Sequence, residues 1–220
     1  MNVSASSLCK YGTTTNKATI SGITVGGIPG GPNFMCTTSA ILPLTATQAT
    51  VTTKINGLNV QGATSIMEGA MWGWRVLSPT EPFTQAEPYD EAETKKVLVL
   101  MSDGRNTYYP NNKFVKSWYE QYGYVTMNHL GTTSTDSGTL STAMDGRTTA
   151  ACTNIKAAGI IVYTVGFDIS GNDADDVAAR NVLEGCATEP EFFHEAEDNE
   201  DLVAAFEAIG DSIRNLHIAR

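Results

Sequence analysis

The chain has 220 residues, of which 41% are hydrophobic and 17% are charged. This composition provides for a sizeable buried core and excludes general disorder. The 14 Lys and Arg residues against 24 Asp and Glu residues give a net charge of -10, which repels nucleic-acid phosphates and anionic lipid and suits a cationic partner, a metal ion included. No apolar stretch of the sequence is long enough to cross a membrane, and the first residues lack the basic and apolar regions of a signal peptide.

The N-terminal part of the chain is predicted to be rich in loops. Residues 1–44 include the run Gly-Gly-Ile-Pro-Gly-Gly-Pro at 26–32, which cannot lie inside a helix or a central strand. Helical periodicity begins near Thr45, and this first helix is expected to end at about residue 56, before Gly57.

A second helix and a first strand are expected next. Thr64 or Ser65 is predicted to cap the helix, which carries an apolar stripe and ends at Pro79. After an acidic loop rich in Pro, residues 97–101 form the unbroken apolar run Val-Leu-Val-Leu-Met. A run of this length is typical of a strand that is buried on both faces of a parallel sheet.

The rest of the sequence alternates further helices with strands. Residues 105–145 are interpreted as a long, Tyr-rich insertion with weak local structure, and a helix is expected at 148–158. A second buried strand follows at 160–166. The remaining expected elements are a helix capped by Asp173 or Asp175, a short strand at 191–194 and a long final helix capped by Asn199. This alternation predicts an open α/β fold with parallel strands and right-handed crossovers.

The four cysteines are Cys9, Cys36, Cys152 and Cys186. No pair has the short spacing of a zinc site. An even number of widely spaced cysteines in a Thr-, Asn- and Gly-rich sequence favours disulfides in an oxidising compartment, with the pairing Cys9–Cys36 and Cys152–Cys186. The alternative is four reduced, partly buried thiols.

Two side chains are candidates for a ligand site. In an open α/β sheet, ligands bind beyond the carboxyl ends of the strands, and Asp103 lies directly after the strand at 97–101. Thr64 precedes a helix and offers a hydroxyl to the same crevice. Carboxylate, hydroxyl and water oxygens suit a hard cation, Mg²⁺ above all. The alternative is that Asp103 is a turn residue and Thr64 a helix cap.

Several stretches together resemble a known family. The segments 62–64, 97–104, 159–167 and 183–211 resemble the later half of a von Willebrand factor A (VWA) domain. More narrowly, the segments 72–79, 122–124 and 216–220 resemble bacterial TadG-like proteins of the Tad (tight adherence, Flp pilus) machinery. The resemblance implies a doubly wound α/β fold with a mostly parallel sheet.

The resemblance also implies a metal-ion-dependent adhesion site (MIDAS). In the family this site is built from an Asp-x-Ser-x-Ser segment, a Thr before a later helix and an Asp after the fourth strand. Thr64 matches the second part and Asp103 the third, whereas the first part is missing. The segment Asn2–Ser6 looks similar, but the loop-rich sequence after it does not match the helix that should follow. Two protein ligands leave a Mg²⁺ site incomplete in this chain.

The family comparison therefore implies an N-terminally truncated domain. Residues 1–44 are interpreted as a loop-rich segment at the end of the truncated strand region, and residues 45–220 as the C-terminal part of a VWA domain. Loss of the first strands makes the apolar strand at 97–101 an unprotected sheet edge. We expect a three-stranded parallel remnant that is poorly stable alone and prone to aggregation.

The function implied by the resemblance is a non-enzymatic binding or adhesion module of Tad pilus assembly, with metal-dependent protein binding in the full-length form. Such proteins lie outside the cytoplasm, in the periplasm or cell envelope, and are anchored in the inner membrane; their partners are pilus or envelope proteins. The aromatic residues of the insertion either contact a partner or pack as a small cluster of their own. The alternatives are a structural scaffold with a degenerate metal site and, less favoured, a metal-dependent hydrolase, for which no nucleophile elbow or phosphate loop is present.

Overall fold

The computed structural model describes residues 39–58, 63–111 and 115–218. The chain divides into two compact units, residues 1–62 and residues 63–220, and each is described by itself. In the first unit, helix α1 (Gln48–Asn56) contains no buried residue and ends at Gly57. The Ser39 hydroxyl donates a hydrogen bond to the Gly57 carbonyl at 2.9 Å.

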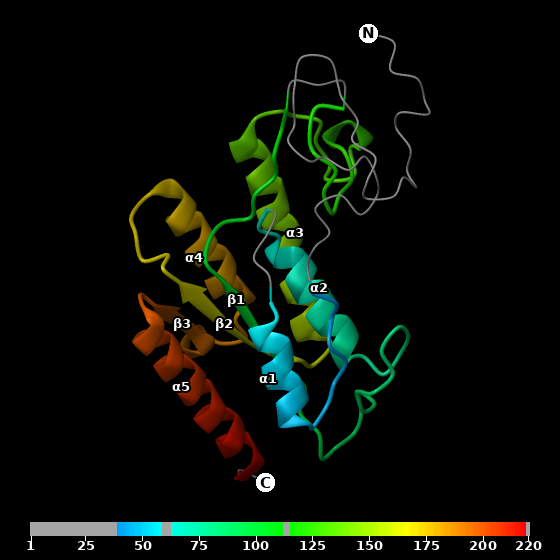
Figure 1. Ribbon diagram of the computed structural model, residues 1–220, viewed down its shortest axis with the longest axis vertical. Helices are drawn as coiled ribbons and strands as arrows, with labels where there is room; N and C mark the ends of the chain where they lie inside the picture. Colours follow the sequence, from blue (N-terminus) through cyan, green and yellow to red (C-terminus); the bar gives the residue numbers. More distant parts are fainter. Residues whose placement is uncertain (1–38, 59–62, 112–114, 219–220) are drawn as a thin grey trace. The chain divides into compact units, whose positions relative to one another are not determined.

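The second unit alternates helices with parallel strands, as expected for an α/β fold (Figure 1). Its elements are α2 (Ile66–Leu77), β1 (Val97–Ser102), α3 (Ser137–Ala157), β2 (Ile161–Phe167), α4 (Ala174–Cys186), β3 (Phe193–Ala196) and α5 (Asn199–Ile218). The strands form one sheet in the order β1-β2-β3, and both neighbouring pairs are parallel. The three-stranded parallel sheet predicted from the sequence is therefore confirmed in the described residues.

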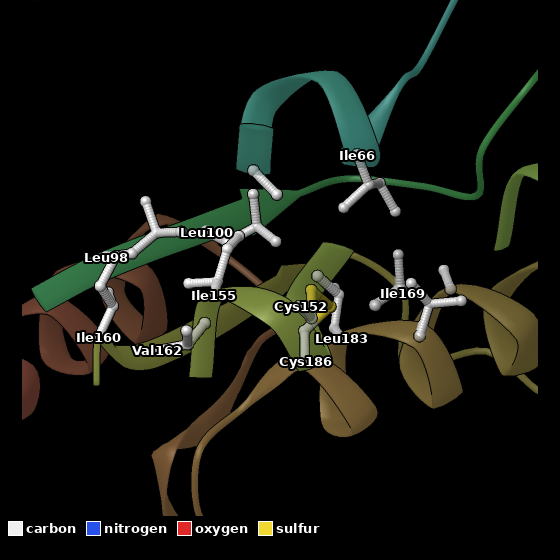
Figure 2. Packing of buried hydrophobic residues seen from close by; sticks show 13 residues of the cluster. Ile66, Leu98, Leu100, Cys152, Ile155, Ile160, Val162, Ile169, Leu183 and Cys186 are labelled. Atoms are coloured by element: carbon white, nitrogen blue, oxygen red, sulfur yellow. A yellow bond between two sulfur atoms is a disulfide. The ribbon is translucent and has the colours of Figure 1, made fainter. Parts of the chain in front are cut away.

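Helices cover both faces of this sheet, because the side chains of each strand alternate between them. Leu98 and Leu100 of β1 and Val162 of β2 pack against α2, α3 and α4 in one apolar cluster (Figure 2). On the opposite face, Tyr163 and Val165 of β2 pack against α5. The central strand β2 is thus buried on both sides, which explains its continuous apolar sequence.

Helix α2 lies close against β1 because its inner face includes small residues where the two elements meet. Ala70 is fully buried, and a Cβ added at Gly73 would lie 2.5 Å from Leu98 Cδ1. The start of the helix is capped by Ser65, whose side chain accepts a hydrogen bond from the Glu68 amide at 3.4 Å. This packing places the residues just before α2 at the same end of the sheet as the end of β1.

Helix α3 begins earlier than the sequence suggested. The insertion was expected to run to residue 145 and the helix to begin at Thr148, but α3 begins at Ser137, after the N-cap Asp136, which accepts a hydrogen bond from the Thr139 amide at 2.7 Å. The buried face of α3 includes the polar residues Ser141 and Thr148. These polar residues interrupt the apolar pattern by which a helix is recognised in a sequence.

Two smaller corrections concern the C-terminal elements. The last helix was expected to be capped by Asn199, but Asp198 accepts the hydrogen bonds from the amides of Glu200 and Asp201, at 2.8 and 3.0 Å. The strand expected at 191–194 begins instead at Phe193, after a short 3-10 helix. The expected cap Asp173 is confirmed, since its carboxylate accepts from the first two acidic residues of α4.

The structure contains the predicted disulfide between Cys152 of α3 and Cys186 of α4, with the two Cα atoms 5.0 Å apart (Figure 2). Both residues are fully buried within the apolar cluster beneath the sheet. The bond therefore joins two helices that cover the same face. Cys9 and Cys36 lie outside the described residues.

Strand β1 lies at an edge of the sheet that the described residues form. It carries no charged residue and no Pro, and the Met101 side chain is 46% exposed. The neighbouring Lys96 does not protect this edge as edge lysines often do, because its ammonium group donates to the Leu77 carbonyl at 2.7 Å and to the Glu87 carbonyl. The expected tendency to aggregate stays a prediction.

The disulfide is expected to contribute substantially to the stability of the second unit. Replacing both Cys152 and Cys186 by Ala should lower the free energy of unfolding by about 3–4 kcal/mol, because the bond closes a long loop in the unfolded chain. Denaturant unfolding with and without a reductant measures this loss. A reductant should destabilise the wild-type protein more than the double variant, which can lose only the predicted Cys9–Cys36 bond. Equal unfolding midpoints for the oxidised wild type and the oxidised variant would contradict the prediction.

Candidate functional site

The two segments that carry the predicted ligands lie side by side at the carboxyl end of β1. Thr64 stands just before α2, and Asp103 directly after β1. The backbone amide of Thr107 donates to the Thr64 carbonyl at 2.9 Å. The amide of Ile66, the first residue of α2, donates to the Asn106 side-chain oxygen at 2.8 Å. Two hydrogen bonds, made by the consecutive loop residues 106 and 107, therefore join the loop after β1 to the start of α2.

Asn106 connects this pair of segments to a third element. Its side chain is fully buried, and its amide nitrogen donates to Asp145 Oδ1 at 2.9 Å and to Thr148 Oγ1 at 3.0 Å, both on α3. The carboxamide thus uses one acceptor and both of its donor hydrogens. The sequence analysis missed this residue, because an Asn in a polar loop after a strand looks like an ordinary turn residue.

Arg105 adds an electrostatic connection at the same end of the sheet. Its guanidinium lies 3.3 Å from the Asp145 carboxylate on α3 and 3.0 Å from the Asp175 carboxylate at the start of α4. The Asp175 side chain is 76% exposed, so that ion pair is screened by solvent. Burial raises the pKa of Asp145, and the Asn106 hydrogen bond and the Arg105 charge oppose this rise.

Thr64 and Asp103 themselves are available for a ligand. Within the ranges that the structure describes, no hydrogen bond or ion pair engages the Thr64 hydroxyl or the Asp103 carboxylate. Ser102, by contrast, donates its hydroxyl to the Gly104 carbonyl at 2.8 Å and so holds the turn. A hydroxyl and a carboxylate oxygen fit the chemistry of a hard divalent cation, whose remaining positions water can fill.

The described residues supply only part of a metal shell. Among residues 39–58, 63–111 and 115–218, no group of three or more His, Cys, Asp or Glu side chains could hold a metal ion. Thr64 and Asp103 therefore fit a cation in kind but provide two of the roughly six ligands that Mg²⁺ takes. Their role as metal ligands stays a prediction.

The Tyr-rich insertion has an inner and an outer part. Tyr108 is buried in a cluster with Val125, Leu130, Leu140 and Met144, which packs the insertion onto α3, and its hydroxyl donates to the Gly123 carbonyl at 2.5 Å. Tyr109 and Tyr119, in contrast, are 49% and 63% exposed. The inner residues therefore pack as a small cluster of their own, whereas the outer residues remain available for a partner.

Glu120 is a partly buried acidic group inside the insertion. Its Oε1 accepts a hydrogen bond from the Tyr109 amide at 2.8 Å, and its buried Oε2 has no partner in the part of the chain that the structure describes. Burial raises the pKa of Glu120 to about 7, and the hydrogen bond from Tyr109 opposes this rise. The folded insertion therefore favours the protonated carboxyl group.

This raised pKa predicts a pH-dependent stability. The folded state holds the Glu120 proton up to about pH 7, whereas the ordinary glutamate pKa of 4.5 applies when the chain unfolds. The free energy of unfolding should therefore fall as the pH rises between those values. In Glu120→Gln, which keeps the acceptor for Tyr109, this part of the decrease should disappear.

Thermal unfolding from pH 4.5 to pH 7.5 (about the window of the two pKa values) measures the effect. Glu91→Gln, a change at an exposed residue, is the matched control and should follow the wild type. Parallel pH profiles for wild type and Glu120→Gln would contradict the prediction.

The comparisons with known proteins concern the fold. No protein-family model and no curated protein matches the chain. Among solved structures, the vWF domain of the type V pili tip protein Mfa5 from Porphyromonas gingivalis is similar, with a TM-score of 0.55 and 17% identity over 83% of this chain and 77% of that one. The pilus adhesin SpaC from Lactobacillus rhamnosus GG, in its open conformation, has a TM-score of 0.47 and 16% identity, and the match covers 77% of this chain and 21% of SpaC.

The likeness to the Mfa5 domain establishes the fold class. The chain has a VWA-like α/β fold, with a parallel sheet flanked by helices that is incomplete in the described residues. At 17% identity the likeness shows the fold alone. None of the helices in the described part of the chain has the length and apolar character needed to cross a membrane.

Proposed function

We propose that the chain is a non-enzymatic, VWA-type binding module that acts in pilus assembly or adhesion at the bacterial cell envelope. The observation that carries this proposal is the pairing of the Thr64 and Asp103 segments at the carboxyl end of β1, within a VWA-like fold. Ligands of open α/β sheets bind at this end. The similarity to the vWF domain of a pilus tip protein supports the same setting.

The finer assignment is to the TadG-like proteins of the Tad pilus machinery. It is supported by the sequence phrases at 72–79, 122–124 and 216–220. The Cys152–Cys186 disulfide supports a location outside the cytoplasm, where disulfides persist. In the full-length protein we place the module in the periplasm or envelope, held by an inner-membrane anchor, with pilus or envelope proteins as partners.

Mg²⁺ or another divalent cation is the proposed cofactor. Thr64 would hold it through the hydroxyl and Asp103 through the carboxylate, with water and ligands from outside the described residues in the remaining positions. The cation would accept an acidic group of the partner protein. The role of Arg105 in this scheme is to keep the loop after Asp103 attached to α3 and α4.

A structural scaffold with a degenerate metal site is the second candidate. This candidate is favoured by the small number of protein ligands, since Thr64 and Asp103 are only two of the roughly six that Mg²⁺ takes. In that case the exposed aromatic residues of the insertion, Tyr109 and Tyr119, would carry the partner contact without a metal ion.

Calorimetric titration of the full-length protein with Mg²⁺ and Mn²⁺ separates the two candidates. Asp103→Ala should weaken cation affinity at least about tenfold, because it removes the anionic ligand that the described residues supply, a loss of about 1.4 kcal/mol or more. Asp90→Ala, at an exposed residue of the loop before β1, makes the same change of charge and should bind as the wild type does. Equal affinity of wild type and Asp103→Ala would contradict the metal proposal.

A further inference from the structure

We propose that Asn106 is the positioning residue of the candidate cation site: its buried carboxamide sets the place of Thr64 relative to Asp103. The inference rests on the proposed cation binding by Thr64 and Asp103. It goes beyond that proposal, because Asn106 provides no ligand and acts only through the two residues that do.

The position of Thr64 depends on how the first turn of α2 is held. The amide of Ile66 belongs to the first turn of the helix, where backbone N–H groups have no partner within the helix. Here the partner comes from the other segment, since Asn106 Oδ1 accepts this hydrogen bond at 2.8 Å. The Thr64 carbonyl, on the other side of Ser65, accepts from the Thr107 amide at 2.9 Å. These two hydrogen bonds lie on either side of Ser65, so the chain directly after Thr64 is tied to residues 106 and 107.

The Asn106 side chain is itself fixed in one orientation. Both hydrogens of its amide group are used, one by Asp145 Oδ1 and one by Thr148 Oγ1. Asn106 and Thr148 are fully buried, and the Thr148 hydroxyl donates to the Met144 carbonyl at 3.0 Å. A buried network in which every member is satisfied is rigid, because any rearrangement leaves a buried polar group unpaired.

Asp103 lies on the same short loop, three positions before Asn106. The turn between them is held by Ser102, whose hydroxyl donates to the Gly104 carbonyl, and by Arg105, whose guanidinium pairs with Asp145. The hydrogen bonds of Asn106 to α2 and α3 therefore hold the loop that carries Asp103 in place beside the segment that carries Thr64. Residues that orient metal ligands in this way commonly change metal affinity about 10–100-fold when they are replaced.

The chemistry at position 106 is specific. The position needs one acceptor and two donors, which a carboxamide has and a carboxylate or an apolar side chain lacks. In Asn106→Asp the acceptor for Ile66 remains, but the new carboxylate faces the carboxylate of Asp145. Adding Asp145→Asn restores a donor for the hydrogen bond between residues 106 and 145, but not for the one to Thr148, so the double variant should recover most of what the single variant loses.

The test is a Mg²⁺ titration of the full-length protein by calorimetry, combined with thermal unfolding. We expect Asn106→Asp to bind Mg²⁺ about tenfold more weakly, and the Asn106→Asp, Asp145→Asn double variant to regain most of the affinity. Asn154→Asp, the same change at an exposed position of α3, should leave the affinity unchanged. If Asn106→Asp does not fold, Thr148→Val, which removes one acceptor of the network, replaces it and should also weaken binding.

The outcomes separate this inference from the proposed function. An Asn106→Asp variant that is folded and binds Mg²⁺ as the wild type does, while Asp103→Ala still loses affinity, overturns the positioning role and leaves the metal site in place. For Thr148→Val, unchanged affinity has the same meaning. A single variant that binds weakly without recovery in the double variant also overturns it, because a general loss of packing would do the same. If the wild type binds no Mg²⁺ at all, the proposed metal site fails.

Discussion

The burial of β2 on both faces is the constraint on which the rest of the structure depends. Its five central residues are buried, from Val162 to Gly166, so helices must cover both sides of the sheet. Even the polar Thr164 is satisfied inside, since its hydroxyl donates to the Leu183 carbonyl at 2.9 Å. Parallel pairing of β1 with this strand then sends the end of β1, and with it Asp103, to the end of the sheet where α2 begins. The place of the candidate site follows from the packing of the core.

Hydrogen bonds and ion pairs at the carboxyl end of β1 fix the positions of α2, α3 and α4 relative to one another. The apolar clusters bring α2, α3 and α4 to one face, but apolar contacts are not directional. Direction comes from Asn106, which joins the start of α2 to α3, and from Arg105, which joins the same loop to α3 and α4. The disulfide within the cluster joins α3 to α4. These connections thus hold the residues just before α2 and the loop after β1 in fixed positions.

Much of this could be read from the sequence, and the reasons for the exceptions are physical. Strand β2 was predictable because a strand buried on both faces is apolar throughout. Strand β1 was recognised by the same apolar pattern, but only one of its faces is buried and the other is partly buried or exposed. The nearness of the two segments that carry Thr64 and Asp103 agrees with the general rule for strand ends. The start of α3 was not predictable, because the buried face of this helix includes the polar residues Ser141 and Thr148. The role of Asn106 could not be predicted for a related reason. It depends on hydrogen bonds to three residues of α2 and α3, and a sequence does not show which distant residues meet.

Paramagnetic broadening of backbone amide signals by Mn²⁺ shows whether a divalent cation binds at the carboxyl end of β1, as we propose. We predict that substoichiometric Mn²⁺ broadens the amide signals of residues 64–66 and 103–107 first, because these segments adjoin the Thr64 hydroxyl and the Asp103 carboxylate. The chain has other acidic stretches, at 87–93, 173–176 and 197–201. Broadening confined to those stretches would contradict the account.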